Sequence, residues 1–474
     1  AAFLTGSYPI RTGYQGIPIL PGEIRSIPHD FPTLPKALQS LGYSTHLVGK
    51  WHLGSASKSH TPLSYGYDSH YGYWEGFIGY FNHSLVTKGL TGQNFYSNYQ
   101  PLPNVTGHYV TDLLTRKALD IIENQPKGKP LHLVVSHLAG HTGKSIGGND
   151  GVLEVANKQD NDFNYFYIED EIRRMYAEII EKMDDSIGEI VKALSRKKLL
   201  DNTIVLFFSD NGAPTVGTYQ NRGSNFPFRG MKMSLFDGGV RVPAMLYSGK
   251  LKNRGRIYKN LFHVTDWAPT LYAAAGGKDN LFADGINQWE ELMNGGKLEK
   301  RKEILLNIDE ELGYSGLIQG KYKLIKGKYL DEKASQYWGE INDTLIPSYS
   351  IGKVLFSNTN MALNWMMLSQ IKRLFVLRRQ ATKTNCRPRY GDFSPCGEIC
   401  LFDLEKDPCE SRDVSAEQPE ILEAMLKRLR EYDSGRVRQQ LNVFHPESNP
   451  DRCGGYWYNW LDEDGCWFNN TRSV

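Results

Sequence analysis

A lysine and a histidine stand two residues apart at the end of one strand-like segment. In the run GKWHLG (residues 49–54), the side chains of Lys50 and His52 would point to the same side of an extended chain. The glycines on either side allow other backbone or a ligand to approach closely. The pair is a candidate ligand-binding or catalytic site. The alternative is a loop with a surface lysine and a hydrogen-bonded histidine.

A second strand-like segment ends in oxygen-bearing side chains. In FFSDNG (residues 207–212), Asp210 and Asn211 offer hard oxygen ligands suited to Ca²⁺ or Mg²⁺, and Gly212 permits a sharp turn. An Asx turn that ends a strand has the same sequence pattern. Taken alone, the segment indicates either a metal site or a turn.

Two further segments carry histidine or basic side chains. His141 lies in SHLAGHTG (residues 136–143), where His137 competes with it, and a single histidine is more often structural than catalytic. Arg229 and Lys232 precede a glycine-rich turn in FRGMKMSLFDGGVRVP (residues 228–243), although lone basic residues in loops are normally solvated. Neither segment decides a function by itself.

The elements that must position these residues alternate between strand-like and helix-like segments. We expect strands at Ser44 to Val48, Leu131 to Ser136 and Ile204 to Phe208. The last two are nearly continuous apolar runs, the pattern of strands buried on both faces. Helical spacing predicts helices at Phe31 to Leu41, Tyr176 to Leu194 and Asp266 to Ala275.

This alternation predicts an α/β fold, with a large, mostly parallel or mixed sheet flanked by helices. Ligands of such sheets bind beyond the carboxyl ends of the strands. The turns after Val48, Ser136 and Phe208 should therefore share one functional edge.

The character of the chain changes after about residue 305. The sequence pattern predicts two short strands over residues 315–327, joined at Gly320-Lys321, and an amphipathic helix over residues 417–432. It predicts irregular structure for residues 330–390. We therefore expect a large domain over residues 1–305 and a smaller α+β domain over residues 306–474, the latter stapled by disulfides.

Composition excludes several classes of protein. Hydrophobic residues make up 40% and charged residues 23% of the 474 residues, which is typical of a globular protein. The 55 Lys and Arg nearly balance the 53 Asp and Glu, so no charge footprint for nucleic acid or a membrane surface is present. No apolar run reaches the ~20 residues of a transmembrane helix.

The cysteines and sequons favour the secretory pathway, either lysosomal or extracellular. All six cysteines lie in the last 90 or so residues, which favours disulfides, while zinc at Cys396 and Cys400 is the alternative. The complete set of cysteines is Cys386, Cys396, Cys400, Cys409, Cys453 and Cys466. Possible N-glycosylation sites are Asn82, Asn104, Asn342 and Asn469.

Several motifs, taken together and in order, resemble the type I sulfatase family and its arylsulfatase B-like branch. LTGSYPIRTG (residues 4–13) looks like the tail of the first sulfatase signature, and GYSTHLVGKWHLG (residues 42–54) matches the second almost throughout. FSDNG, RGMKMSLFDGGVRVP, HVTDWAPTL and CLFDLEKDP follow in the family's order. The resemblance covers most of the chain.

The resemblance implies an alkaline phosphatase-like fold and a sulfatase catalytic domain over residues 1–305. It implies hydrolysis of a sulfate ester, of a small molecule or a saccharide, through a formylglycine made from Cys by the formylglycine-generating enzyme. It also implies that Asp210 and Asn211 bind Ca²⁺, that Lys50 and Lys232 hold the sulfate, that His141 protonates the leaving oxygen, and that His52 contacts the formylglycine.

The match departs from the family pattern at its start. The signature Cys, its neighbouring Arg and an Asp-Asp pair that supplies other metal ligands would precede Ala1, and Ser7 replaces the usual Arg after Leu-Thr-Gly. We therefore expect an N-terminally truncated sulfatase that does not turn over sulfate esters as printed. The alternatives are a related phosphodiesterase or phosphonate hydrolase, and a non-catalytic sulfatase-like binding protein.

Overall fold

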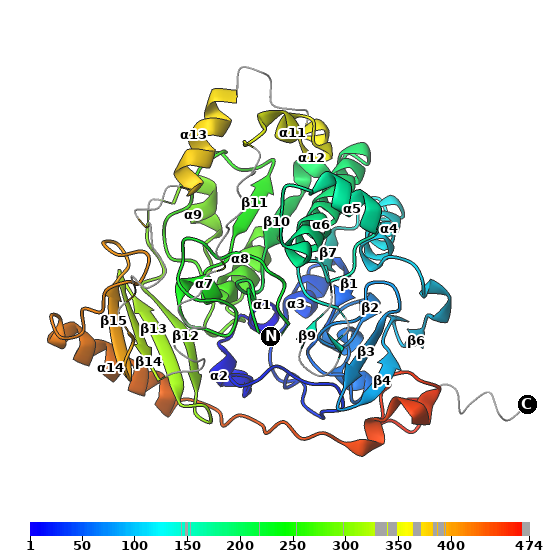
Figure 1. Cartoon of the computed structure of the whole chain (residues 1–474), viewed down its shortest axis with the longest axis horizontal. Coiled ribbons are helices and arrows are strands. Elements are labelled where there is room, and N and C mark those ends of the chain that lie inside the picture. Colours follow the sequence, from blue (N-terminus) through cyan, green and yellow to red (C-terminus); the bar gives the residue numbers. More distant parts are fainter. Residues whose placement is uncertain are drawn as a thin grey trace, which may run out of the picture.

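The structure is a computed structural model (Figure 1). It describes residues 1–143, 145–146, 150–151, 153–217, 219–252, 254–296, 298–327, 339, 348–363, 371–382, 386, 393 and 395–466. Two of the four sequons, Asn342 and Asn469, lie outside these residues. Of the other two, Asn104 is exposed and Asn82 is half-buried. No helix in the described ranges is long and apolar enough to cross a membrane.

Within the described residues, five strands form the main sheet in the order β6-β5-β2-β1-β7. The central strand β1 pairs in parallel with β2 on one side and with β7 on the other, whereas β5 and β6 add antiparallel pairs at one edge. The sheet is therefore mixed. Its strands are β1 (Ser44–Lys50), β2 (Ser69–Tyr73), β5 (Tyr96–Ser97), β6 (Gln100–Pro101) and β7 (Leu131–Ser136).

The next long strand, β10 (Ile204–Phe208), pairs antiparallel with β11 (Ala244–Ser248). β7 and β10 have the predicted bounds, but every residue of both strands is only half-buried. The prediction that both strands are buried on both faces is wrong. The reason is that β7 and β10 line a large cavity, and among the described residues each of them pairs with a strand on one side only.

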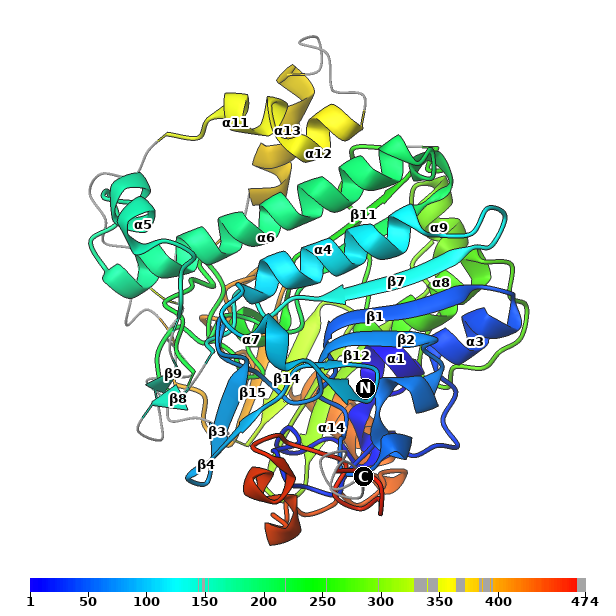
Figure 2. The same cartoon turned by 90° about the vertical axis from the view of Figure 1, so that its right-hand side faces the viewer.

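Helices cover both faces of the main sheet. On one face, α4 (Val110–Glu123) and α6 (Glu171–Arg196) lie side by side (Figure 2). Val48 packs on this side with Leu113 and Leu114, while the next residue inward, Leu47, packs on the other side with Leu4. This alternation is what an extended strand imposes. Beyond that second face, α3 (Leu34–Ser40) contacts α8 (Trp267–Ala274).

The long helix α6 follows from local sequence. Its N-cap is Asp170, whose carboxylate accepts the backbone N–H of Arg173 at 2.8 Å. Such a cap satisfies a donor that the helix itself leaves unpaired. Ile179 joins the core beneath β1, and Val191 and Leu194 join a second apolar cluster with α4.

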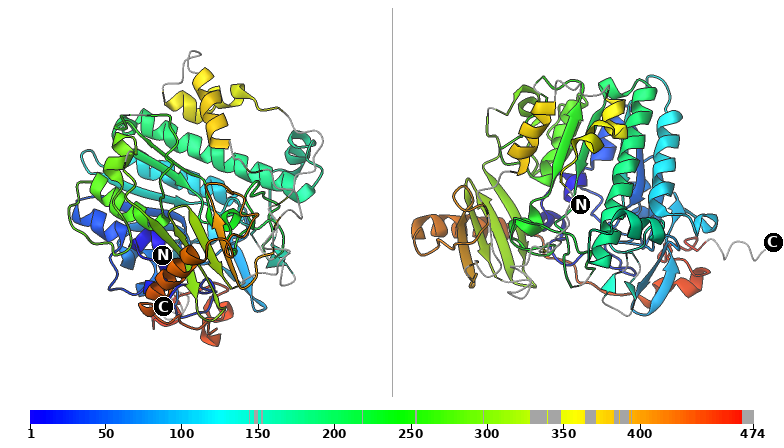
Figure 3. Two further views of the ribbon diagram at one scale, coloured as in Figure 1. Left: turned by 90° about the vertical axis from the view of Figure 1, so that its left-hand side faces the viewer. Right: turned by 45° about the horizontal axis from the view of Figure 1, so that its top comes forward.

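The smaller C-terminal part contains a four-stranded antiparallel sheet in the order β12-β13-β14-β15. Helix α14 (Pro419–Ser434) lies across the outer face of this sheet (Figure 3). The division expected after residue 305 falls inside its first strand. The strands are β12 (Glu303–Asp309), β13 (Tyr314–Gln319), β14 (Tyr322–Lys326) and β15 (Ile399–Asp403).

The segment expected to be irregular contains helices in its described ranges. These are α11 (Ile351–Leu355), α12 (Asn358–Ala362) and α13 (Ile371–Thr382). Asn358 Nδ2 donates to Glu189 of α6 at 3.1 Å, which places α12 on the outer side of α6. The prediction of irregular structure for residues 330–390 is therefore wrong for these ranges. α11 and α12 were missed because five residues are too few to show an apolar period.

After α14 the chain returns to the first part of the molecule and runs along its lower edge (Figure 1). Gln93 bridges to Tyr456, and the side chain of Asp462 accepts from Ser57 and from the backbone of Lys58, both at 2.7 Å. The cysteines form three disulfides, which confirms the disulfide prediction and removes the zinc alternative. The pairs are Cys386–Cys409, Cys396–Cys400 and Cys453–Cys466.

Candidate active site

A cavity of about 2070 Å³ begins at the carboxyl end of β1 and extends between β7 and β10. All six residues that the sequence singles out as candidate site residues line it. They are Lys50, His52, His141, Asp210, Asn211 and Lys232. The turns after β1, β7 and β10 thus meet at one cavity.

Lys50 is the last residue of β1, where it pairs with Tyr73 of β2. Burial lowers the pKa of its ammonium group to about 8, Asp210 opposes that shift, and the positive charge of Lys232 adds to it. Lys50 therefore stays mostly protonated at neutral pH. A second ammonium group and a carboxylate lie close enough to act on it.

His52 lies beyond the end of β1, in a left-handed backbone conformation with φ of 57°. The prediction that Lys50 and His52 share a side assumed that the strand continues through both residues, but β1 ends at Lys50. The assumed geometry is therefore wrong, although both residues line the cavity. Its Nε2–H donates to the carbonyl oxygen of Ile19 at 2.8 Å, which leaves Nδ1 as an acceptor. Burial, followed by the charge of Lys50, lowers the pKa of the ring to about 3.

His141 is held at the turn after β7. Its Nδ1–H donates to the carbonyl oxygen of Thr142 at 2.6 Å, and its Nε2 lies 3.5 Å from Nζ of Lys232. Burial and the charges of Lys50 and Lys232 hold the pKa of the ring well below its usual range. The competing His137 also lines the cavity, but His141 is the one next to Lys232.

Lys232 reaches the cavity from a loop that packs against the turn containing Asp210. Its backbone N–H donates to the carbonyl oxygen of Ala213 at 3.2 Å. Asn225 joins the same two segments, because its side chain accepts from the N–H of Ala213 and donates to the carbonyl oxygen of Gly230. Burial lowers the pKa of the Lys232 ammonium group.

Arg229 does not behave as the solvated loop residue that the sequence suggests. It is completely buried, its Nη1 donates to the carbonyl oxygen of Glu410 at 2.8 Å, and its guanidinium stacks on the ring of Phe236 at 4.0 Å. No local sequence signal predicts this role, because Glu410 is 181 residues away.

Asp210 and Asn211 fit part of a cation site. Asp210 is exposed and makes no hydrogen bond to another described residue, while Asn211 Nδ2 donates to the carbonyl oxygen of Gly212 at 2.9 Å and leaves Oδ1 free. Carboxylate and amide oxygens suit Ca²⁺. In the described part of the chain, His, Cys, Asp and Glu form no group of three or more that could hold a metal ion. The pair therefore fits as two ligands of a larger set.

Comparisons with known proteins identify the family of this chain. The family model described as Sulfatase matches residues 1–277. Arylsulfatase J of Mus musculus is 31% identical over 469 residues, which span 98% of this chain and 72% of that protein. N-acetylgalactosamine-6-sulfatase of Homo sapiens is 30% identical over 315 residues, 63% of this chain and 57% of that protein.

A solved structure shows the same fold. The crystal structure of Ps i-CgsB in complex with k-i-k-neocarrahexaose matches 100% of this chain and 88% of its own, with a TM-score of 0.67 and 20% identity. This likeness confirms the predicted α/β fold with a smaller sheet at its C-terminal end.

Proposed function

The chain belongs to the sulfatase family, and on that premise we propose that the protein hydrolyses sulfate monoesters in the cavity described above. The observation that carries the proposal is the convergence of positive and proton-transferring groups. Nζ of Lys232 lies 3.5 Å from Nε2 of His141, and Lys50 and Lys232 lie close enough to influence each other's charge. This arrangement suits a small dianion or an ester of one.

Lys50 and Lys232 bind the sulfate group in this proposal. A sulfate ester carries negative charge on its outer oxygens, and attack on sulfur adds to it. Two ammonium groups that are partly buried and already positioned stabilise that charge better than mobile surface lysines would. A cation bound to the carboxylate of Asp210 would keep that carboxylate from neutralising the two ammonium groups.

His141 donates a proton to the leaving oxygen in this proposal. Its Nδ1–H is held by the carbonyl oxygen of Thr142, so Nε2 is the atom that faces the sulfate. The bound anion offsets the charges of Lys50 and Lys232, which raises the pKa of the ring and favours the protonated form when substrate is present. His52, held at Ile19, presents Nδ1 as an acceptor on the same cavity.

We propose Ca²⁺ as the metal and a formylglycine as the nucleophile. The cation would be held in part by the oxygens of Asp210 and Asn211, and it would supply positive charge beside the sulfate. The first sulfatase signature places the modified Cys just ahead of the segment that begins at Ala1. Ala1 lines the cavity, which supports this placement.

The substrate class, partner and compartment are proposed at a coarser level. The relatives include an N-acetylgalactosamine-6-sulfatase and arylsulfatases, which supports sulfated sugars and aryl sulfates as candidate substrates. A formylglycine-generating enzyme would be the partner during maturation. Three disulfides support a route through the secretory pathway to a lysosome or the cell exterior.

The test is sulfate release from nitrocatechol sulfate by the protein that includes the signature Cys, coproduced with the modifying enzyme. We expect activity that EDTA abolishes and Ca²⁺ restores. A phosphate diester of nitrophenol serves as the comparison substrate. Hydrolysis of the phosphate diester but not of the sulfate ester would support a phosphodiesterase instead, and hydrolysis of neither would leave a binding protein.

A further inference from the structure

Three ionisable side chains lie fully buried behind the loop that carries Lys232, and none of them lines the cavity. Lys323 on β14 and Glu410 are completely buried, and Asp237 is 4% exposed. Asp237 begins the short helix α7 (Asp237–Val240), which directly follows the Lys232 segment. Charged groups are rarely buried unless they are paired.

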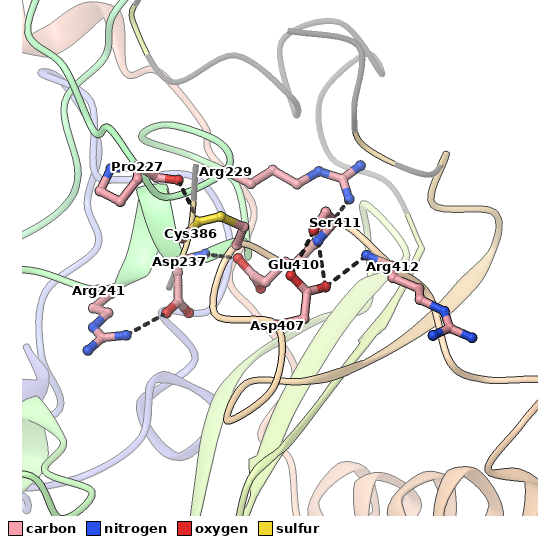
Figure 4. The surroundings of a disulfide bond; sticks show 10 residues. Pro227, Arg229, Asp237, Arg241, Cys386, Asp407, Glu410, Ser411 and Arg412 are labelled. Atoms are coloured by element: carbon pink, nitrogen blue, oxygen red, sulfur yellow. Dashed lines mark hydrogen bonds and ion pairs between the residues drawn. A yellow bond between two sulfur atoms is a disulfide. The ribbon is translucent and has the colours of Figure 1, made fainter. Parts of the chain in front are cut away.

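These three residues pair with one another across the two parts of the molecule. Nζ of Lys323 lies 2.8 Å from Oδ1 of Asp237 and 2.6 Å from Oε1 of Glu410. The other oxygen of Glu410 accepts the backbone N–H of Asp237 at 2.6 Å (Figure 4). Glu410 therefore caps the first turn of α7 while it is itself held by a lysine of the C-terminal sheet.

The backbone of Glu410 forms a second anchor for the same loop. Its carbonyl oxygen accepts from Nη1 of Arg229, and its backbone is left-handed with φ of 57° (Figure 4). The preceding residue, Cys409, is joined to Cys386 by a disulfide. Arg229 and Asp237 bracket the Lys232 segment, so both ends of that segment are attached to Glu410.

Helix α7, at the end of this loop, in turn holds the Asp210 turn. The N–H of Gly212 donates to the carbonyl oxygen of Gly239 at 2.9 Å, and a Cβ on Gly212 would lie 1.8 Å from the carbonyl oxygen of Gly238. The N–H of Gly238 donates to the carbonyl oxygen of Arg229 at 2.7 Å. The two segments are in backbone contact, so a shift of α7 moves both.

We propose that Glu410, held by Lys323, is a positioning residue that sets the placement of Lys232 and of the Asp210–Asn211 turn. The inference rests on the proposed function for its link to catalysis. Glu410 does not line the cavity. It acts through the N–H of Asp237 and through Arg229, and a displacement of the order of 1 Å in such a loop lowers turnover by about 100-fold.

The experiment compares Glu410→Ala, which removes the acceptor for the Asp237 N–H, with Glu410→Gln, which keeps an oxygen there. Glu303→Ala is the matched control, because Glu303 accepts from Arg428 and Tyr432 in the same C-terminal part, away from the loop. In the active enzyme we expect Glu410→Ala to lower kcat/KM about 30- to 100-fold, with both kcat and KM affected. Glu410→Gln should stay within about fivefold, and Glu303→Ala should leave kcat and KM near normal.

Hydrogen exchange on the 474-residue chain gives a readout that needs no catalysis. In Glu410→Ala, amides of residues 210–213 and 229–241 should exchange about tenfold faster than in the unchanged chain, while Glu303→Ala should not alter them. If Glu410→Ala does not fold, Glu410→Asp replaces it, with a smaller loss expected in the same direction.

A folded Glu410→Ala enzyme with kcat/KM within threefold of normal would overturn the proposal. If the unchanged enzyme released no sulfate from any ester, the proposed function would fail separately. Hydrogen exchange would then test the positioning role of Glu410 by itself. Unchanged exchange rates in residues 210–213 and 229–241 of Glu410→Ala would contradict that role.

Discussion

At the scale of single residues, the protonation of His141 links binding to chemistry. Without an anion, burial and the charges of Lys50 and Lys232 hold the pKa of the ring well below 6.5, so the ring is neutral near pH 6. In the proposed site, a bound sulfate would face all three groups and cancel part of the positive field, which would raise the pKa of the ring. A ring with a raised pKa in the complex takes up a proton as the anion binds.

We therefore predict that sulfate binding to the 474-residue chain takes up a fraction of a proton near pH 6, and that this fraction grows as the pH falls toward 5. Titration calorimetry in two buffers of different ionisation enthalpy measures it. His141→Ala should bind sulfate with little uptake. A binding enthalpy that does not depend on the buffer would contradict the role assigned to His141.

Lys232 provides a second test at the residue scale. Lys232→Ala removes one of the two ammonium groups that we propose to bind the sulfate, and it should lower kcat about 100- to 1000-fold in the active enzyme. Lys326→Ala is the control, because Lys326 is exposed at the end of β14. Near-normal turnover in Lys232→Ala, measured as sulfate release, would remove Lys232 from the site.

At the scale of elements, the apolar strands and the long helices were predicted from sequence, whereas the helices α11, α12 and α13 and the irregular segments were not. The apolar runs of β7 and β10 gave the bounds of both strands, because β-branched and aromatic residues in short runs favour strands. The left-handed backbone of His52 and the buried position of Arg229 were not predictable. Both depend on partners that are distant in the chain, Ile19 for the ring of His52 and Glu410 for the guanidinium of Arg229.

The candidate site itself was predictable as a set of residues but not as a geometry. Strand ends in an α/β fold meet at one edge, so Lys50, His141 and Asp210 were expected to lie together. Lys232 was different, because its loop is held by a backbone contact with Ala213 and by contacts of Arg229 and Asp237 with the distant Glu410. The sequence alone indicated Lys232 only as a basic residue before a glycine-rich turn, and the resemblance to sulfatases supplied its expected role at the sulfate.

The pairing of the strands leads to a prediction about backbone protection. β1 is paired on both sides, whereas β7 and β10 line the cavity and, in the described ranges, each pairs on one side. Alternate amides of β7 and β10 therefore lack a strand partner. In hydrogen exchange of the 474-residue chain, we expect those amides to exchange at least about tenfold faster than the amides of β1. Equal exchange rates in β1, β7 and β10 would contradict this prediction, because they would mean that another segment pairs with the cavity-facing edges of β7 and β10.

At the scale of the whole molecule, residues far apart in the chain are joined at a few buried polar centres. Arg301, just before β12, forms one of these centres. Its guanidinium ion-pairs with Asp266, donates from Nη1 to Tyr8 Oη at 2.9 Å, and donates to the carbonyl oxygen of Asp284 at 2.8 Å. Asp266 belongs to the HVTDWAPTL motif, where it pairs with Arg301 and does not line the cavity, whereas Leu271 at the end of the motif does line it.

Asp266 is completely buried and Arg301 is 3% exposed, so removal of one partner leaves the other charge without compensation. Arg301→Met should therefore lower the free energy of unfolding by about 3–5 kcal/mol, because an unpaired buried carboxylate is costly. Arg301→Met with Asp266→Asn should recover part of that loss, since the amide can still accept from the N–H of His263, as Asp266 does at 2.9 Å.

Urea unfolding followed by circular dichroism measures this difference, with Lys302→Ala as the neighbouring control. Lys302 forms only an exposed ion pair with Glu299, so its removal should change the unfolding free energy by less than about 1 kcal/mol. The same variants should lower sulfate binding only as far as they unfold the chain, because Arg301 does not line the cavity. If Arg301→Met were as stable as Lys302→Ala, the two sheets would be held together by apolar packing, and the buried pair would contribute orientation without stability.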